Sequence, residues 1–206
     1  MRIAVLTFEG FNELDSFIAS AMLNRAKQHG ISAAITCPTA RVTSMNGVVV
    51  EAQAPLAFAR EADAVIVGSG MATREVVRTP ELLAQLRLDP ARQVIGAQCS
   101  GALVLAKLGL LGKLPACTDT STKPWVQEAG IQVLDQPFVA HGNVATAGGC
   151  LGSHYLAAWM IARLAGWKAA EAVVRYVAPV GEKQEYVDRA FAAVGRYLPA
   201  KDPVSA

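Results

Sequence analysis

The sequence predicts an α/β layered fold with a largely parallel sheet, and two observations predict it. Short apolar runs rich in β-branched residues alternate with segments whose apolar residues recur at helical spacing, which is typical of helices packed on a parallel sheet. One run, residues 93–98, passes through Cys99 directly into a helix-period segment, and small residues flank the join. Such a strand–turn–helix corner places a side chain over the carboxyl edge of the sheet.

The first half of the chain is expected to supply three sheet strands, a hairpin and two helical segments. The hairpin is centred on Asn46-Gly47, a dipeptide strongly favoured in tight turns. Gly30 ends the first helix, Pro38 ends the second strand, and Pro80 divides the second helix. By residue number, the expected strands are 2–7, 31–37 and 62–67, the hairpin strands are 42–45 and 48–51, and the helices are 14–29 and 73–88.

The second half continues the alternation. Gly109 closes the helix after Cys99, Gly130 ends a short helix, and Gly142 lies in the turn between two short strands. By residue number, the expected strands are 93–98, 131–134, 138–140 and 143–147, an extended piece covers 114–118, and the helices are 100–110, 121–129, 151–164, 169–176 and 184–197.

The composition is that of one apolar globule. Of the 206 residues, 52% are hydrophobic and 17% are charged, so we expect residues 1–198 to form a single domain followed by a frayed tail, 199–206. A net charge of +2 without a lysine–arginine stripe argues against a nucleic-acid partner. The first apolar run is too short for a signal peptide, and no segment is long and uncharged enough to cross a membrane, so a cytoplasmic protein is expected.

The four cysteines stand in unrelated sequence contexts: Cys37, Cys99, Cys117 and Cys150. There is no CxxC motif and no cysteine–histidine spacing suited to zinc, so neither a metal nor another cofactor is expected. In a reducing cytoplasm all four are expected to be free thiols.

Cys99 is the candidate nucleophile. At the start of a helix, backbone N–H groups and the helix dipole stabilise an anion, so a thiol there is expected to lose its proton more easily. The alternative is a structural cysteine buried in the core.

The loop after the first strand carries two acids, Glu13 and Asp15. Glu13 is expected only to complement the dipole of its helix. Asp15 has apolar neighbours that suggest partial burial, and beside a thiolate its pKa would rise far enough to retain a proton. Asp15 is therefore the candidate general acid.

Two further loops should meet Cys99, because ligands bind outside the carboxyl ends of parallel strands. In the loop Gly68-Ser69-Gly70-Met71, glycine lets a backbone N–H approach a ligand and form an oxyanion hole with the Ser100 N–H, unless the loop is an ordinary turn. In the other loop, Thr118 and Asp119 either bond Asp15, a substrate or water, or cap the helix at 121–129.

No histidine is placed as a clear partner for the thiol. His154 alone has a case for reaching the pocket, so a thiolate with a carboxylic acid is expected rather than a triad. Five side chains are pocket candidates, with core packing as their alternative: Phe11, Met71, Trp125, Phe138 and His154.

With these motifs in view, the chain resembles the ThiJ/PfpI superfamily. The residues that carry the resemblance are Gly10 to Asp15, Gly68-Ser69-Gly70, Ala97-Gln98-Cys99-Ser100-Gly101, residues 109–113 and Thr146-Ala147-Gly148-Gly149. The resemblance covers nearly the whole chain and implies a flavodoxin-like three-layer α/β/α sandwich with a nucleophile elbow, related to class I glutamine amidotransferases. It also implies a homodimer.

Within that superfamily the chain looks most like isocyanide hydratase and the amidase-like domains of some transcription regulators. The resemblance maps the nucleophile to Cys99, the acid to Asp15 and the oxyanion glycine to Gly70. Three departures stand out: the oxyanion turn lacks a proline, Asp119 occupies a position where many relatives have histidine, and Ser100 replaces the threonine of isocyanide hydratase. The Ser100 hydroxyl is still expected to bond the acid.

These observations predict a cofactor-independent cysteine enzyme, a hydratase or hydrolase that hydrates a small electrophile such as an isocyanide. Two alternatives remain open. One is glyoxalase-like or deglycase-like activity on methylglyoxal-type carbonyls, which usually needs a histidine partner. The other is a non-enzymatic redox-sensing or ligand-binding protein in which Cys99 is oxidised without turnover.

Overall fold

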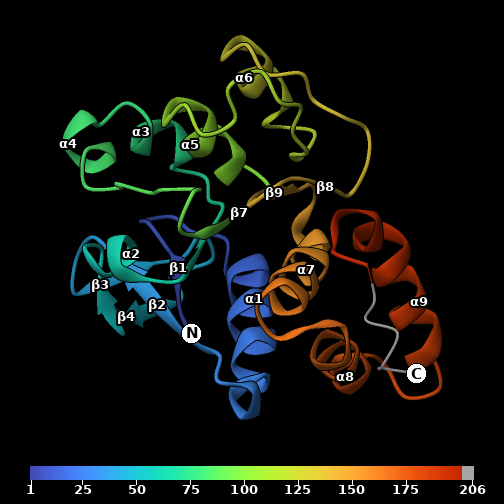
Figure 1. The fold of residues 1–206 in the computed structure, drawn as a ribbon. Helices are drawn as coiled ribbons and strands as arrows, with labels where there is room; N and C mark the ends of the chain where they lie inside the picture. The colour runs from blue at the N-terminus through green and yellow to red at the C-terminus, as the bar shows by residue number, and fades with distance from the viewer. Residues whose placement is uncertain (201–206) are drawn as a thin grey trace.

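The computed structural model describes residues 1–200 and has a seven-stranded sheet at its centre (Figure 1). The strand order is β5-β2-β1-β6-β7-β9-β8, and every pair is parallel except β8 with β9. The strands are β1 (Arg2–Leu6), β2 (Ser32–Cys37), β5 (Ala54–Pro55), β6 (Ala64–Val67), β7 (Val94–Gln98), β8 (Phe138–His141) and β9 (Val144–Ala147).

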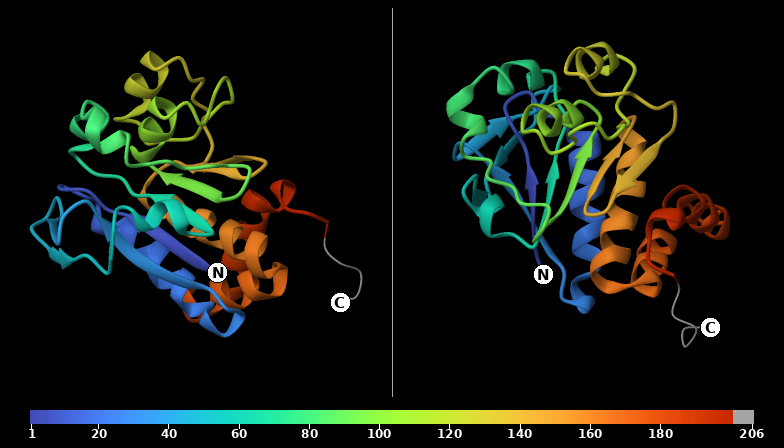
Figure 2. Two further views of the ribbon diagram at one scale, coloured as in Figure 1. Left: turned by 60° about the vertical axis from the view of Figure 1, so that its left-hand side comes forward. Right: turned by 45° about the horizontal axis from the view of Figure 1, so that its top comes forward.

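Helices cover both faces of the sheet, so the fold is the expected flavodoxin-like three-layer sandwich (Figure 2). The strands are mostly apolar on both faces because alternate side chains enter two different cores: Ile3 and Val5 face one, Ala4 and Leu6 the other. The first core is covered by α1 (Glu13–Arg25), α7 (Ser153–Ala165), α8 (Trp167–Val177) and α9 (Lys183–Val194). The second is covered by α2 (Phe58–Glu61), α3 (Thr73–Val76), α4 (Pro80–Leu83), α5 (Gly101–Lys107) and α6 (Lys123–Glu128).

Most expected elements are present, and Pro80 divides the helical segment after residue 73 as expected. The hairpin forms as β3 (Arg41–Thr43) and β4 (Val49–Glu51), but its turn is wider than the Asn46-Gly47 pair, because the Ser44 hydroxyl accepts hydrogen bonds from two N–H groups of the loop. The expected strand at 131–134 is wrong: Val133 makes only an isolated bridge to Ala116.

Two short elements were not expected, β5 and α2, and both are too brief to show a periodic pattern. The 3-10 turns η1 (Lys27–His29), η2 (Cys150–Gly152) and η3 (Gly195–Tyr197) lie at the ends of expected helices. Part of the expected tail, residues 201–206, lies outside the described residues. Within residues 1–200, no helix has both the length and the apolar character needed to cross a membrane.

The carboxyl ends of β1, β6, β7 and β9 meet at one edge of the sheet, and the elbow lies there. β7 ends at Gln98, α5 begins at Gly101, and Cys99 occupies the corner with φ +42°, the one non-glycine residue of 1–200 with positive φ. Such a backbone costs about 1–3 kcal/mol and needs external support. The Cys99 N–H donates to the Ala147 carbonyl at 2.9 Å, and the Thr118 hydroxyl donates to the Cys99 carbonyl at 2.7 Å.

The elbow also depends on Gly101, since a Cβ at this position would lie 2.5 Å from the Val67 carbonyl oxygen. We predict that Gly101→Ala lowers the free energy of unfolding by about 1–3 kcal/mol, because backbone must move to make room. Gly152→Ala is the matched control: its nearest neighbours lie at 3.4 Å, an ordinary contact, so its effect should stay within about 0.5 kcal/mol. Chemical denaturation measures both values, and equal effects would contradict the role given to Gly101.

Candidate active site

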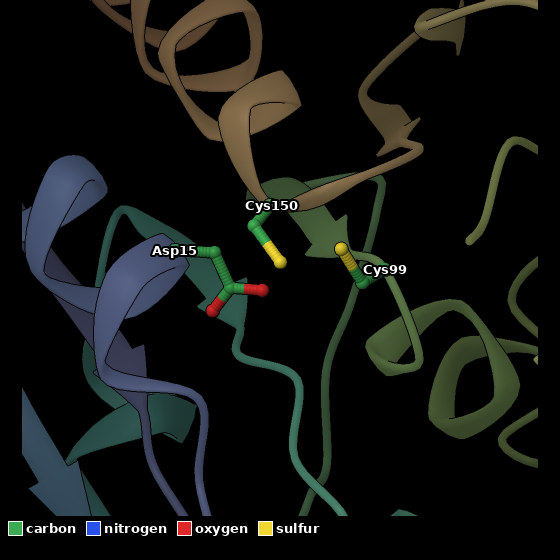
Figure 3. Close-up of side chains that lie close together, drawn as sticks. All are labelled: Asp15, Cys99 and Cys150. Atoms are coloured by element: carbon green, nitrogen blue, oxygen red, sulfur yellow. The ribbon is translucent and has the colours of Figure 1, made fainter. Parts of the chain in front are cut away.

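Three side chains converge at the carboxyl edge of the sheet: Asp15, Cys99 and Cys150 (Figure 3). One ligand atom of each, a carboxylate oxygen or a sulfur, lies within 4.8 Å of the other two. They come from the first turn of α1, from the elbow and from η2. The strands that precede these segments are neighbours or near neighbours in the sheet, which explains how residues far apart in sequence meet.

Asp15 is completely buried, and its surroundings fix its position. The Ser69 hydroxyl donates to one carboxylate oxygen at 2.5 Å, and the Gln98 side-chain amide donates to the Asp15 backbone carbonyl at 3.1 Å. Asn12 caps the start of α1 by accepting a hydrogen bond from the Leu14 N–H. The cap and the two side-chain bonds together turn Asp15 toward Cys99.

Burial governs the proton affinity of both groups. Loss of solvent raises the pKa of Asp15 to about 6, although hydrogen bonds from Ser69 and Cys99 partly oppose the shift. Burial also raises the pKa of Cys99, which is 3% exposed, and the negative charge of Asp15 raises it further. The expectation that the thiol ionises easily is therefore wrong for the resting site: the pair retains a proton, and it resides on sulfur.

The Gly70 N–H, expected to bind an oxyanion, forms a hydrogen bond within the protein instead. The Gly70 N–H donates to the Ser100 hydroxyl oxygen at 3.0 Å, and that hydroxyl also bonds Thr73 at 2.7 Å. The Ser100 hydroxyl thus contacts the turn and not Asp15, contrary to expectation. The Ser100 N–H has no acceptor among residues 1–200, so it is the free backbone donor beside the sulfur.

Gly70 itself is required by close packing. A Cβ there would lie 2.6 Å from the Gly10 carbonyl oxygen, because the loop after β6 packs directly on the loop after β1. The Met71 N–H and the Gly10 carbonyl join the two loops at 3.0 Å.

Thr118 and Asp119 have structural partners. Thr118 supports the Cys99 carbonyl, as described above. Asp119 accepts hydrogen bonds from the Ser121 and Thr122 N–H groups and from the Thr122 hydroxyl, so it ties together the turn that leads into α6. These bonds lie in the turn before α6, whose N-cap is Thr122, and Asp119 also lines the cavity described next.

A cavity of about 360 Å³ opens above Cys99. Met71 and Trp125 line it, whereas Phe11 and Phe138 are fully buried core residues. The side chains and loops that line the cavity are Asn12, Met45, Ser69, Gly70, Met71, Cys99, Ser100, Asp119, Ser121, Thr122, Trp125 and Cys150.

His154 does not line this cavity, contrary to expectation. Its ring bonds the Leu151 carbonyl through Nδ1 and faces a separate apolar cavity bounded by α1, α8 and α9. Burial lowers the pKa of His154, which keeps the ring neutral. His154 therefore cannot serve the thiol.

Sequence reasoning missed Ser69, Asn12 and Cys150. Two of the cysteines are brought together by the fold although their sequence contexts are unrelated: Cys150 lies beside Cys99 and accepts a hydrogen bond from Asn12 at 3.1 Å. Two sulfurs and a carboxylate are also the donor types that zinc accepts, so these are the residues that could hold a metal ion. The sequence carried one signal for Cys150: it follows a predicted strand, as Cys99 does. The two strands, β9 and β7, are neighbours in the sheet.

The fold and the site together define an α/β protein with a buried cysteine–carboxylic acid pair at a strand–helix elbow. Residues 1–165 match the DJ-1/PfpI family, and the chain belongs to that family. This confirms the ThiJ/PfpI resemblance seen in the sequence.

Solved structures with the same fold include Schizosaccharomyces pombe DJ-1, with 20% identity, a TM-score of 0.75, and coverage of 87% of this chain and 100% of that one. Drosophila melanogaster DJ-1beta has 23% identity, a TM-score of 0.76, and coverage of 85% and 96%. A THiJ/PfpI family protein from Pseudomonas syringae has 22% identity, a TM-score of 0.74, and coverage of 94% and 90%. At these identities the likeness shows the fold alone. Comparison with curated protein sequences finds no match.

The raised pKa of Asp15 predicts a pH-dependent stability. Folding raises this pKa from its ordinary 3.8 to about 6. The ionised, buried carboxylate therefore lowers the free energy of unfolding by its full amount above pH 6, and by nothing below pH 3.8, where the group is protonated in both states. Asp15→Asn, which is neutral throughout, should therefore raise the free energy of unfolding at pH 7 by up to about 3 kcal/mol. The gain should vanish near pH 4.

Urea denaturation at both pH values measures this difference. Glu13→Gln, on the same helix, is the control, because the pKa of Glu13 is lowered and its loss should bring no gain at pH 7. An Asp15→Asn variant that is less stable than wild type at pH 7 would contradict the burial argument.

Proposed function

We propose that this protein is a cofactor-independent cysteine enzyme that hydrates a small electrophile in the manner of isocyanide hydratase. Cys99 is the nucleophile and Asp15 is the proton carrier. The observation that supports this most is that the buried Asp15 carboxylate lies within 4.8 Å of the Cys99 sulfur, which lines the cavity. A buried acid whose pKa is close to neutrality is suited to proton transfer in both directions.

The reaction begins with attack of the Cys99 sulfur on the terminal carbon of an isocyanide. Asp15 takes the thiol proton as the carbon–sulfur bond forms and delivers it to the same carbon, which gives a thioimidate. Water then adds to that carbon, and Asp15 takes a proton from the water and passes it to the imidate nitrogen. The tetrahedral adduct breaks its carbon–sulfur bond, and its hydroxyl proton returns through Asp15 to the Cys99 sulfur. The product is an N-substituted formamide, and both catalytic groups return to their starting protonation states.

Backbone groups would stabilise the charge that develops on the substrate. The Ser100 N–H is free and lies directly after the nucleophile, so it is the first donor available to an anionic centre. The Gly70 N–H can contribute only if the substrate displaces the Ser100 hydroxyl from it.

The cavity wall favours an apolar substituent on the substrate. Met45 and Met71 are 44% and 68% exposed, and with Trp125 they offer apolar surface across from Cys99. No histidine lines the cavity among residues 1–200, which favours hydration over the methylglyoxal reaction.

We further propose that residues 1–198 act as one domain and that the protein is a cytoplasmic homodimer. Light scattering of the purified protein tests the dimer.

Turnover of an alkyl isocyanide by the purified protein tests the proposal. Wild type should form the formamide, Cys99→Ala should lose activity to the uncatalysed level, and Asp15→Asn should lose about 10²–10⁴-fold in kcat. Cys117→Ala is the matched control, because it removes a buried thiol outside the cavity and should keep wild-type activity. Absence of turnover by wild type, or full activity of Cys99→Ala, would overturn the proposal.

A further inference from the structure

We propose that Cys99 and Cys150 form a reversible redox pair, in which a hydroperoxide oxidises one thiol and the other closes a disulfide across the site. Their sulfur atoms lie within 4.8 Å of each other and line the same cavity. Figure 3 shows the two side chains directed toward each other from different elements. This modification goes beyond the proposed hydration and does not depend on it.

The fold holds the two cysteines at the ends of neighbouring strands. β7 and β9 pair in parallel up to Gln98 and Ala147, and Cys99 donates its N–H to Ala147. A disulfide needs a sulfur–sulfur distance of about 2.05 Å, so the sulfurs must approach by up to about 3 Å. Gly149 gives the loop before Cys150 room to move, because it has positive φ and a Cβ added to it would meet no other atom within 4 Å.

Exposure decides which sulfur a peroxide meets first. Cys150 is partly exposed, whereas Cys99 is 3% exposed. The Asn12 side-chain amide donates to the Cys150 sulfur at 3.1 Å and holds it at the cavity wall. Cys150 is therefore the sulfur that oxidises first, and Cys99 is the thiol that resolves it.

The chemistry balances with the hydroperoxide as the only oxidant. The Cys150 thiol reacts with the peroxide to give a sulfenic acid and an alcohol, or water when the oxidant is hydrogen peroxide. The Cys99 sulfur then attacks the sulfenic sulfur. Asp15 accepts the Cys99 proton and passes it to the departing hydroxyl group, which leaves as water. An external dithiol returns both thiols by exchange. The disulfide blocks the nucleophile and protects it from irreversible oxidation.

The other two cysteines provide internal controls. Cys37 and Cys117 are buried, and neither lines the cavity. The Cys37 sulfur interacts with the Thr7 hydroxyl at 3.0 Å. Among residues 1–200, neither belongs to a group of three or more histidine, cysteine or acidic side chains.

Mass spectrometry of the intact protein after mild hydrogen peroxide treatment tests the proposal. Wild type should lose two hydrogens, regain them with dithiothreitol, and yield a cross-linked peptide pair that contains Cys99 and Cys150. Cys150→Ser should lose the cross-link completely, and Cys99→Ser should carry a sulfenic acid on Cys150 that dimedone traps. Cys37→Ser should keep the cross-link.

Wild type that instead gains oxygen on Cys99 without a cross-link, or that pairs other cysteines, would overturn the proposal. The readout is a mass, so a failure of isocyanide turnover leaves this test intact. Circular dichroism of each variant confirms that the fold is retained before oxidation.

Discussion

The buried contact between the Asp15 carboxyl group and the Cys99 sulfur is the interaction on which the whole site depends. Burial raises the proton affinity of both groups, and the carboxylate charge raises that of the thiol further, so the pair keeps a proton where a solvated acid would release it. In such a buried site the thiol proton can pass from Cys99 to Asp15 and on to a substrate without passing through bulk water. The site therefore relies on exclusion of solvent and not on a helix dipole, since α5 spans only Gly101–Lys107.

The sheet edge enforces that contact at some cost in local backbone energy. Cys99 keeps a positive φ because strand β9, Thr118 and the start of α5 hold its N–H and carbonyl groups. The loops after β1 and β6 pack through Gly70 at a distance that excludes any side chain. These constraints place the sulfur at the cavity floor, while Met45 and Met71 leave the opening adaptable.

The layered fold, the elbow and the position of Asp15 could be predicted from sequence because each leaves a local pattern. Buried parallel strands are apolar throughout, an elbow needs small flanking residues, and loops after parallel strands share one edge. The protonation of Cys99, the Ser69 bond to Asp15 and the proximity of Cys150 depend on burial and on distances between segments, which no local pattern carries. His154 was misplaced for the same reason: the direction of its side chain depends on how α7 packs.

The site depends on the Asp15 carboxylate, which raises the pKa of the Cys99 thiol. The pH dependence of Cys99 alkylation by iodoacetamide, located by peptide mass spectrometry, tests this effect most directly. Asp15→Asn removes the negative charge but keeps the shape of the side chain, so the apparent pKa of Cys99 should be lower in this variant than in wild type. An equal or higher pKa in the variant would contradict the account, because it would mean that Asp15 stabilises a thiolate in the resting site.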